Sequence, residues 1–344
     1  MDDDADVSVA LECAADVIWE RTPSMKDVLG FMAFMCNMTE EGVLEYMRGS
    51  ELWGVATSMG VDVGVRNLGL CMLRCCWRLG DKLKKKDIRV RCEVIRWQRV
   101  DIQDPERNRD VFPAVDPCFS FITHTPRNAP DVRVQSEGSG VMNLVSMEMV
   151  RLAGHVLEPF MGDDVCDVRF LGIEQQPYPS NRGGSKKQQI KMWTFAHCLG
   201  AHILGIAMGR GNRDVLLSSL SAQGRSIESE PPPIFHKDGK KRTQKEYHMK
   251  KEWAVDQCVR LVREGREWFT DLRERKQKVD DLADAFLLAL RVTEKCVCEE
   301  WSTSRKRARA EMSAAPPGVE SSDAGEGMSD VIVDLGSDLE DDDL

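Results

Sequence analysis

The stretch GVDVGVRNLG, residues Gly60–Gly69, decides how this chain of 344 residues folds. It reads as two apolar β-type runs joined by a tight turn around Arg66 and Asn67, and the first run contains Asp62. A carboxylate that is buried in a strand without a partner costs several kcal/mol. The stretch therefore predicts both a β-hairpin and a group close to Asp62 that compensates its charge.

Outward from this hairpin, the apolar periodicity predicts an α/β fold. Three strands in series are followed by a helix, a fourth strand, a long helix, a short fifth strand and two further helices, at residues 55–65, 68–79, 88–102, 141–160, 167–176, 186–209, 213–220, 246–265 and 279–301. Hairpin-linked strands that come before crossover units predict a mixed five-stranded sheet with helices on both faces.

Changes in composition divide the chain into three parts. Residues 1–52 form an expected N-terminal helical extension, and residues 53–301 form the main domain, with insertions at about 104–140 and 222–243. Residues 302–344 lose apolar content and are expected to be a disordered tail, first basic and then acidic.

The net charge of −10 hides a basic centre. Residues 319–344 contain ten acidic residues and no basic one, and residues 1–20 contain seven acidic residues, so residues 21–318 carry a net charge of +7. A basic body suits a nucleic-acid binder, although this excess over about 300 residues is weak evidence alone.

Other features of composition concern the compartment. The twelve cysteines are irregularly spaced, which favours reduced thiols in an intracellular, reducing environment over a disulfide framework. No apolar run reaches the roughly 18 residues of a membrane span, so no membrane partner is expected. The run SRKRARA at residues 304–310 resembles a nuclear localisation signal, although it also suits a DNA contact.

Four carboxylates occupy unusual places in this pattern. Asp62 lies inside the first strand, Glu174 ends the fourth, and Asp281 and Asp284 share one face of the last helix because they are three residues apart. If the fold gathers them, four oxygen ligands suit Mg²⁺ or Mn²⁺, and such ions assist phosphodiester hydrolysis. Taken singly, each has an ordinary structural explanation: a turn or edge aspartate, or an acidic helix start favoured by the dipole.

The same residues resemble a known family. GVDVGVRNLGLCML (60–73), GIEQQP (172–177) and VDDLADAFLLAL (279–290) are similar to the acidic motifs of Holliday junction resolvases of the poxvirus and yeast-mitochondrial type. Those enzymes are RuvC-like members of the RNase H-like superfamily. Further similarities are VIRWQRVDI (94–102), KMWTFAHCLGAHI (191–203) and DVLLSSL (214–220), so the resemblance covers roughly residues 55–300.

The resemblance implies a site and a reaction. Asp62, Glu174, Asp281 and Asp284 would be the catalytic metal ligands for Mg²⁺ or Mn²⁺, with the first and fourth strands as neighbours. It also implies a homodimer that acts on a two-fold four-way DNA junction. Gln175 and Gln176 would orient Glu174 or line the DNA groove, and Asp280 is a secondary candidate that is expected to point away from the pair.

Basic residues are the expected DNA contacts. They are Lys186, Lys187, Lys191, Lys240, Lys241, Arg242 and Lys278. Lys278 lies one turn before Asp281 and would touch the scissile phosphate, or is a solvated lysine at a helix start. Such contacts recognise shape and backbone rather than bases.

The acidic end of the tail suggests a contact with a protein partner or with the basic body. DVIVDLGSDLEDDD (330–343) resembles a SUMO-interacting motif, or is a solubilising acidic tail that competes with DNA for the basic body. The expected location is the nucleus or a viral replication site.

Taken together, these patterns predict a Mg²⁺-dependent endonuclease that resolves four-way junctions. The alternatives are another RNase H-like nuclease that cuts branched DNA or RNA–DNA hybrids, and a non-catalytic scaffold that binds DNA junctions.

Overall fold

The computed structural model describes residues 25–49, 53–64, 67–78, 88–100, 111–112, 157, 168–176, 186–209, 215–222, 244–263 and 265–314. Met1–Thr303 form one compact unit and Ser304–Leu344 form a second. Within the helical extension expected at residues 1–52, the structure describes residues 25–49, which lie in the first unit.

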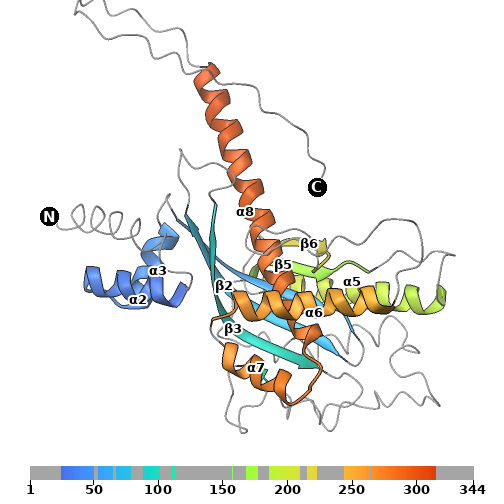
Figure 1. Cartoon of the computed structure of the whole chain (residues 1–344). Helices are drawn as coiled ribbons and strands as arrows, with labels where there is room; N and C mark the ends of the chain where they lie inside the picture. The colour runs from blue at the N-terminus through green and yellow to red at the C-terminus, as the bar shows by residue number, and fades with distance from the viewer. Residues whose placement is uncertain are drawn as a thin grey trace, which may run out of the picture. The chain divides into compact units, whose positions relative to one another are not determined.

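A single mixed sheet forms the centre of the first unit (Figure 1). The strands are β1 (Trp53–Asp62), β2 (Leu68–Arg78), β3 (Val90–Val100), β4 (Val111–Phe112), β5 (Val168–Glu174) and β6 (Leu216–Leu220). Their order is β4-β3-β2-β1-β5-β6, in which β1 to β4 pair antiparallel and β5 and β6 are parallel to β1. The five expected strands are confirmed, and the two-residue β4 adds an edge strand that the sequence pattern did not predict.

Helices cover both faces of this sheet, as expected (Figure 1). The described helices are α2 (Met25–Cys36), α3 (Glu40–Gly49), α5 (Lys186–Gly209), α6 (Gln244–Leu261), α7 (Arg266–Glu274) and α8 (Asp280–Ala314). Successive β1 side chains point to opposite faces, so Met59 and Val61 pack against α5 while Ala56 packs in the core with α6, α7 and α8. Asp62 shares its face with Gly60, which is the α8 face.

Three glycines on adjacent strands let the backbone of α8 approach the sheet. A Cβ at Gly60 would lie 1.9 Å from the carbonyl oxygen of Ala285, and one at Gly69 would lie 2.2 Å from that of Asp281. On β5, a Cβ at Gly172 would come within 2.7 Å of a third α8 carbonyl. No side chain fits at these points. The glycines therefore set the short distance between the α8 backbone and the sheet.

The first turn of α8 is also held from β3. The buried indole of Trp97 donates a hydrogen bond from Nε1 to the carbonyl oxygen of Leu282, at 2.9 Å. The same ring stacks on Phe269 of α7, with centroids 4.8 Å apart, and packs against Phe286 of α8. This tryptophan therefore joins β3, α7 and α8 at the point where α8 begins.

We expect Trp97→Phe to separate the contribution of the hydrogen bond to Leu282 from that of the stacking on Phe269. The phenyl ring keeps much of the stacking but removes the indole N–H that bonds to the Leu282 carbonyl, which still accepts its backbone bond within α8. The free energy of unfolding should therefore fall by about 0.5–1.5 kcal/mol. Urea unfolding monitored by circular dichroism measures this change. A loss below about 0.5 kcal/mol would mean that the hydrogen bond does not help to hold α8.

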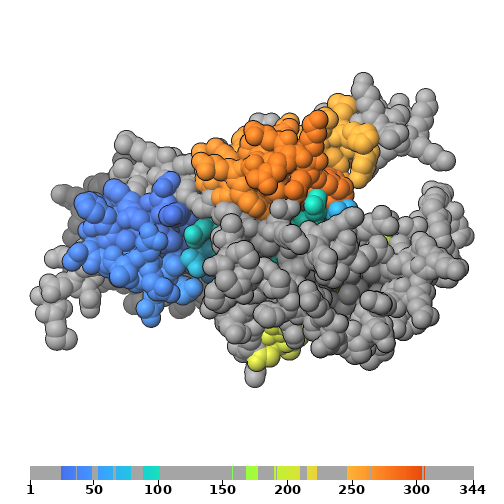
Figure 2. Space-filling view, turned by 90° about the horizontal axis from the view of Figure 1, so that it is seen from below, coloured from blue at the N-terminus to red at the C-terminus, as the bar shows by residue number. Residues whose placement is uncertain are grey.

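The N-terminal helices α2 and α3 pack on the end of the sheet away from α5. Met32 of α2 and Met47 of α3 are fully buried with Trp53 of β1 and Cys76 of β2. In the space-filling view, these two helices form one blue surface, distinct from the orange surface of α6 and α7 (Figure 2).

Several expected boundaries differ from the structure. Helix α7 was not predicted, because its nine residues show only a short apolar pattern between two longer helices. The tail was expected to begin at residue 302, but α8 continues to Ala314. The expected helix at 141–160 lies outside the described residues except for Leu157, and so do nearly all of the two insertions.

Helix α5 corrects one compositional expectation. Its segment Met192–Gly209 is long and apolar enough to pass as a membrane span by length and composition. One face of this segment is buried against the sheet through Phe195, Leu199 and Ile203. The core helix of a folded domain passes the same compositional test.

Candidate functional site

The carboxyl ends of two parallel strands bring Asp62 and Glu174 together. The two residues end β1 and β5, and the preceding pair, Val61 and Ile173, are register partners. Side chains at matching positions of neighbouring strands point to the same face. The side chain of Asp62 is 5% exposed, so its charge is largely removed from water.

Helix α8 supplies the other two carboxylates at its start. Asp281 and Asp284 are buried in the first turns of a helix that rests directly on Gly60 and Gly69. The helix N-terminus favours negative charge, which partly offsets the burial of both groups. The structure therefore gathers all four predicted carboxylates at one edge of the sheet, from elements that are more than 200 positions apart at the extremes.

The electrostatics of Asp62 reflect this convergence. Burial raises the pKa of the Asp62 carboxyl well above its ordinary value, and the negative charges of Glu174 and Asp284 raise it further. Burial also raises the pKa of Asp281 and raises that of Asp284 to about 6, although Lys251 opposes the shift at Asp284. Strongly shifted pKa values of buried, mutually repelling acids cluster at functional sites.

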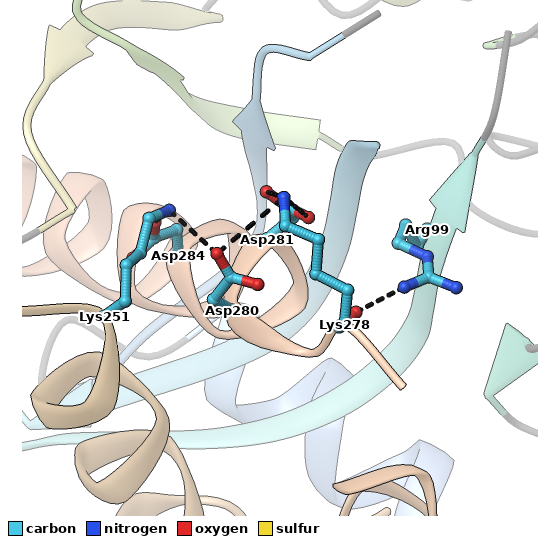
Figure 3. A network of polar contacts seen from close by, with 6 residues as sticks. All are labelled: Arg99, Lys251, Lys278, Asp280, Asp281 and Asp284. Atoms are coloured by element: carbon cyan, nitrogen blue, oxygen red, sulfur yellow. Dashed lines mark hydrogen bonds and ion pairs between the residues drawn. The ribbon is translucent and has the colours of Figure 1, made fainter. Parts of the chain in front are cut away.

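Two lysines offset part of the negative charge of the cluster (Figure 3). The ammonium group of Lys251, on α6, forms an ion pair with Asp284 and lies 3.5 Å from the nearest Asp280 oxygen. Lys278 contacts both carboxylate oxygens of Asp281, at 2.7 and 2.8 Å, and lies 3.8 Å from Asp280. Asp280 was expected to point away from the pair, but it lies between the two lysines because both ammonium groups attract it.

The two glutamines after Glu174 differ from each other. Gln176 donates a hydrogen bond from Nε2 to Glu174 Oε2 at 2.7 Å, an arrangement that orients this carboxylate. The side chain of Gln175 is exposed, and its backbone N–H bonds to the carbonyl oxygen of Leu220 on β6. Of these two glutamines, Gln176 is the one whose side chain contacts and orients Glu174.

The donor set fits a hard divalent cation. Oδ1 of Asp284 is buried and has no hydrogen-bond partner, although an uncompensated carboxylate oxygen is costly in such a place. Carboxylate oxygens are the ligands that Mg²⁺ and Mn²⁺ prefer. As the side chains stand, with the lysines between them, no group of three or more His, Cys, Asp or Glu in the described part of the chain has metal-binding spacing.

The raised pKa of Asp284 predicts how metal-free stability depends on pH. Its folded value of about 6 exceeds the ordinary 3.8, so the folded state holds its proton at a pH where the unfolded chain has released it. Stability from this group is therefore present below about pH 4 and is lost as the pH rises towards 7. The charges that set this shift lie on β1, β5, α6 and α8 itself.

The measurement is urea unfolding in a chelating buffer at several pH values, for the wild type and for Asp284→Asn. The variant should gain on the order of 2 kcal/mol relative to the wild type between pH 4 and pH 7. A difference that stays constant over this range would contradict the raised pKa.

The expected DNA contacts are only partly described. Lys186, Lys187 and Lys191 lie on α5, and only the backbone of these three residues is described. Lys240, Lys241 and Arg242 lie outside the described residues. Lys278 lies beside Asp281, and its backbone carbonyl accepts a hydrogen bond from Arg99 of β3.

Sequence reasoning missed Lys251 as a member of the site. It was not among the expected basic contacts, although its position three residues before the buried Ala254 and seven before the buried Cys258 places it on the inner face of α6. This helical spacing is the sequence pattern that could have identified Lys251 as a member of the site.

No family model and no curated protein matches this sequence. Among solved structures, the yeast mitochondrial Holliday junction resolvase Ydc2 matches with a TM-score of 0.34 and 14% sequence identity. The match covers 83% of this chain and 98% of that chain. A TM-score and an identity this low support no conclusion about function, so the function is inferred from the geometry of the carboxylates.

Proposed function

We propose that this chain is a Mg²⁺-dependent endonuclease with an RNase H-like fold that resolves four-way DNA junctions. The observation that carries the proposal is the convergence of Asp62, Glu174, Asp281 and Asp284 at one edge of the sheet, with a buried Asp284 oxygen that has no partner. Three of these residues, Asp62, Asp281 and Asp284, are buried, and buried carboxylates are costly for a fold unless cations compensate their charge.

The carboxylates would hold Mg²⁺, or Mn²⁺ in its place, between the strand ends and α8. When bound, such ions lower the pKa of a coordinated water and stabilise the leaving oxygen of a phosphodiester, which yields a 5′-phosphate and a 3′-hydroxyl. Gln176 orients Glu174, and Trp97 and the strand glycines hold the first turn of α8 in place. These contacts prepare the ligands before substrate arrives.

Binding of the junction would depend on phosphate contacts and on symmetry. Basic residues of α5 and of the insertion at 222–243 are the proposed contacts, and they recognise backbone and shape. A homodimer would present two such sites to the two-fold junction. We therefore expect affinity to fall steeply with salt concentration.

The test is cleavage of end-labelled synthetic DNA by the purified full chain, with Mg²⁺ or with a chelator. A four-way junction, a fork, an RNA–DNA hybrid and a linear duplex serve as substrates. The proposal expects paired, Mg²⁺-dependent nicks in the junction and at most weak cleavage of the duplex. Preferential cleavage of the hybrid or of the fork would instead assign the chain to another RNase H-like activity.

A second candidate is a junction-binding scaffold without chemistry. It is favoured by the lysine ion pairs at Asp281 and Asp284, and by the lack of metal-binding spacing among the described side chains as they stand. A scaffold would bind the junction equally well with and without Mg²⁺ and would leave it uncut, whereas the proposed nuclease binds in chelator and cuts only after Mg²⁺ is added.

A further inference from the structure

Lys251 differs from an ordinary surface lysine because the core fixes its position. It lies on the same face of α6 as Ala254, Val255 and Cys258, which are buried in the core against α8. Its side chain is 16% exposed, and its ammonium group contacts Asp284 and Asp280. The packing of α6 against α8 thus places the ammonium group of Lys251 beside the carboxylates.

The charge of Lys251 is held strongly in this position. Burial alone would lower the pKa of the ammonium group, but the charges of Asp284 and Asp62 outweigh burial and raise it. One oxygen of Asp284 is occupied by the lysine while the other has no partner. The same carboxylate therefore offers one oxygen to the lysine and one to a further cation.

We propose that Lys251 is a built-in counter-ion of the metal-free site, which holds the buried carboxylates together and competes with divalent metal for them. This inference rests on the proposed metal site. A divalent ion that binds Asp284 would stand within a few ångströms of the ammonium group, and the repulsion between two cations in a partly buried site is strong. An ion at the free Asp284 oxygen is therefore repelled by Lys251, and its binding is weaker for as long as the lysine stays paired with the other oxygen.

Lys278 provides an internal comparison. It pairs with Asp281 as Lys251 pairs with Asp284, but its side chain is 48% exposed and its partner is only three residues away on the same segment. Solvent screens such a pair, and the long side chain can swing into water at little cost. Lys278 should therefore compete with metal much less than Lys251 does.

Lys251→Met keeps the apolar stem of the side chain and removes its charge. This variant should have a less stable metal-free fold but a higher affinity for metal. Without metal, the variant should melt several degrees below the wild type, because the carboxylates lose their counter-ion. With Mn²⁺, its dissociation constant should be lower than that of the wild type by about tenfold or more, because the competitor is gone. A lysine that only stabilises the fold would give looser metal binding, or no change, together with the lower melting temperature.

Isothermal titration calorimetry with Mn²⁺ alone, and thermal melting in chelator, measure both effects on the full chain. Lys251→Arg keeps the charge and should bind Mn²⁺ within about threefold of the wild type. Lys278→Met should tighten binding by less than Lys251→Met does. Lys295→Met removes an exposed lysine that pairs with Glu299 on α8, and it should change neither quantity.

If Lys251→Met does not fold, the double variant Lys251→Met/Asp280→Asn replaces it, with Asp280→Asn as its reference. This pair removes one positive and one negative charge outside the four proposed ligands, and it should still bind Mn²⁺ more tightly than its reference. Equal or weaker binding in the lysine variants, beside measurable binding in the wild type, would overturn this inference alone. Absence of Mn²⁺ binding in the wild type would overturn both the inference and the proposed metal site.

Discussion

Asp62→Asn should abolish nicking of a four-way junction and, at the same time, stabilise the metal-free protein. Activity should fall by on the order of a thousandfold or more, because a neutral amide replaces a carboxylate at the centre of the proposed metal site. Stability at pH 7 should rise, because Asp62 is buried beside Glu174, Asp284 and Asp281, all of which raise its pKa. Removal of its charge relieves that repulsion.

The measurements are single-turnover cleavage of a labelled junction and thermal melting in chelator. Junction affinity in chelator should be retained, which separates loss of chemistry from loss of folding. Asp256→Asn is the matched control, since this aspartate lies on the surface of α6 with its side chain 62% exposed and pairs with Arg273. Undiminished cleavage by Asp62→Asn would refute the assignment of this residue, and a lower melting temperature would contradict its electrostatics.

The second large effect is expected for Gly60→Ala, a change that adds one methyl group beneath α8. The new Cβ would lie 1.9 Å from the carbonyl oxygen of Ala285 and 2.5 Å from the backbone nitrogen of Ala289. Both atoms belong to the α8 backbone, so the whole helix has to move. We expect a loss of about 3 kcal/mol or more in the free energy of unfolding, together with reduced nicking, because Asp281 and Asp284 move with the helix.

Urea unfolding and the junction assay test this prediction. Gly205→Ala provides the control, since a Cβ at this exposed position of α5 meets nothing within 4 Å. Alanine is the better helix former there, so this variant should be up to about 1 kcal/mol more stable than the wild type. If Gly60→Ala were as stable as Gly205→Ala, the close approach of α8 to the sheet would be wrong.

The strands and the carboxylates could be predicted from the sequence because each depends on a local pattern. Apolar β-type runs mark β1 and β5, and the i,i+3 spacing puts Asp281 and Asp284 on one face of α8. The expectation that β1 and β5 are neighbours, which brings Asp62 beside Glu174, came from the family resemblance rather than from any local signal. The strand pairing confirms it and shows that the two strands are parallel.

The contacts that join distant elements could not be predicted in this way. Gly60 and Gly69 look like ordinary strand glycines until the strand register aligns them beneath α8. The contribution of Lys251 depends on how deeply α6 packs against α8, and a helical pattern gives the direction of a side chain but not this depth. The edge strand β4 was missed because two residues are too few to show a period, and α7 was missed because its apolar pattern is short and lies between two longer helices.

The most direct test of the central claim maps the residues that surround a bound ion. Fe²⁺ replaces Mg²⁺ in carboxylate sites, and with ascorbate and peroxide it generates hydroxyl radicals that cut the nearest backbone. The account predicts cuts close to residues 62, 174 and 281–284, all of them suppressed by excess Mg²⁺ and lost in Asp62→Asn. Cuts confined to one of these three segments, or found only elsewhere in the chain, would show that the carboxylates do not share an ion.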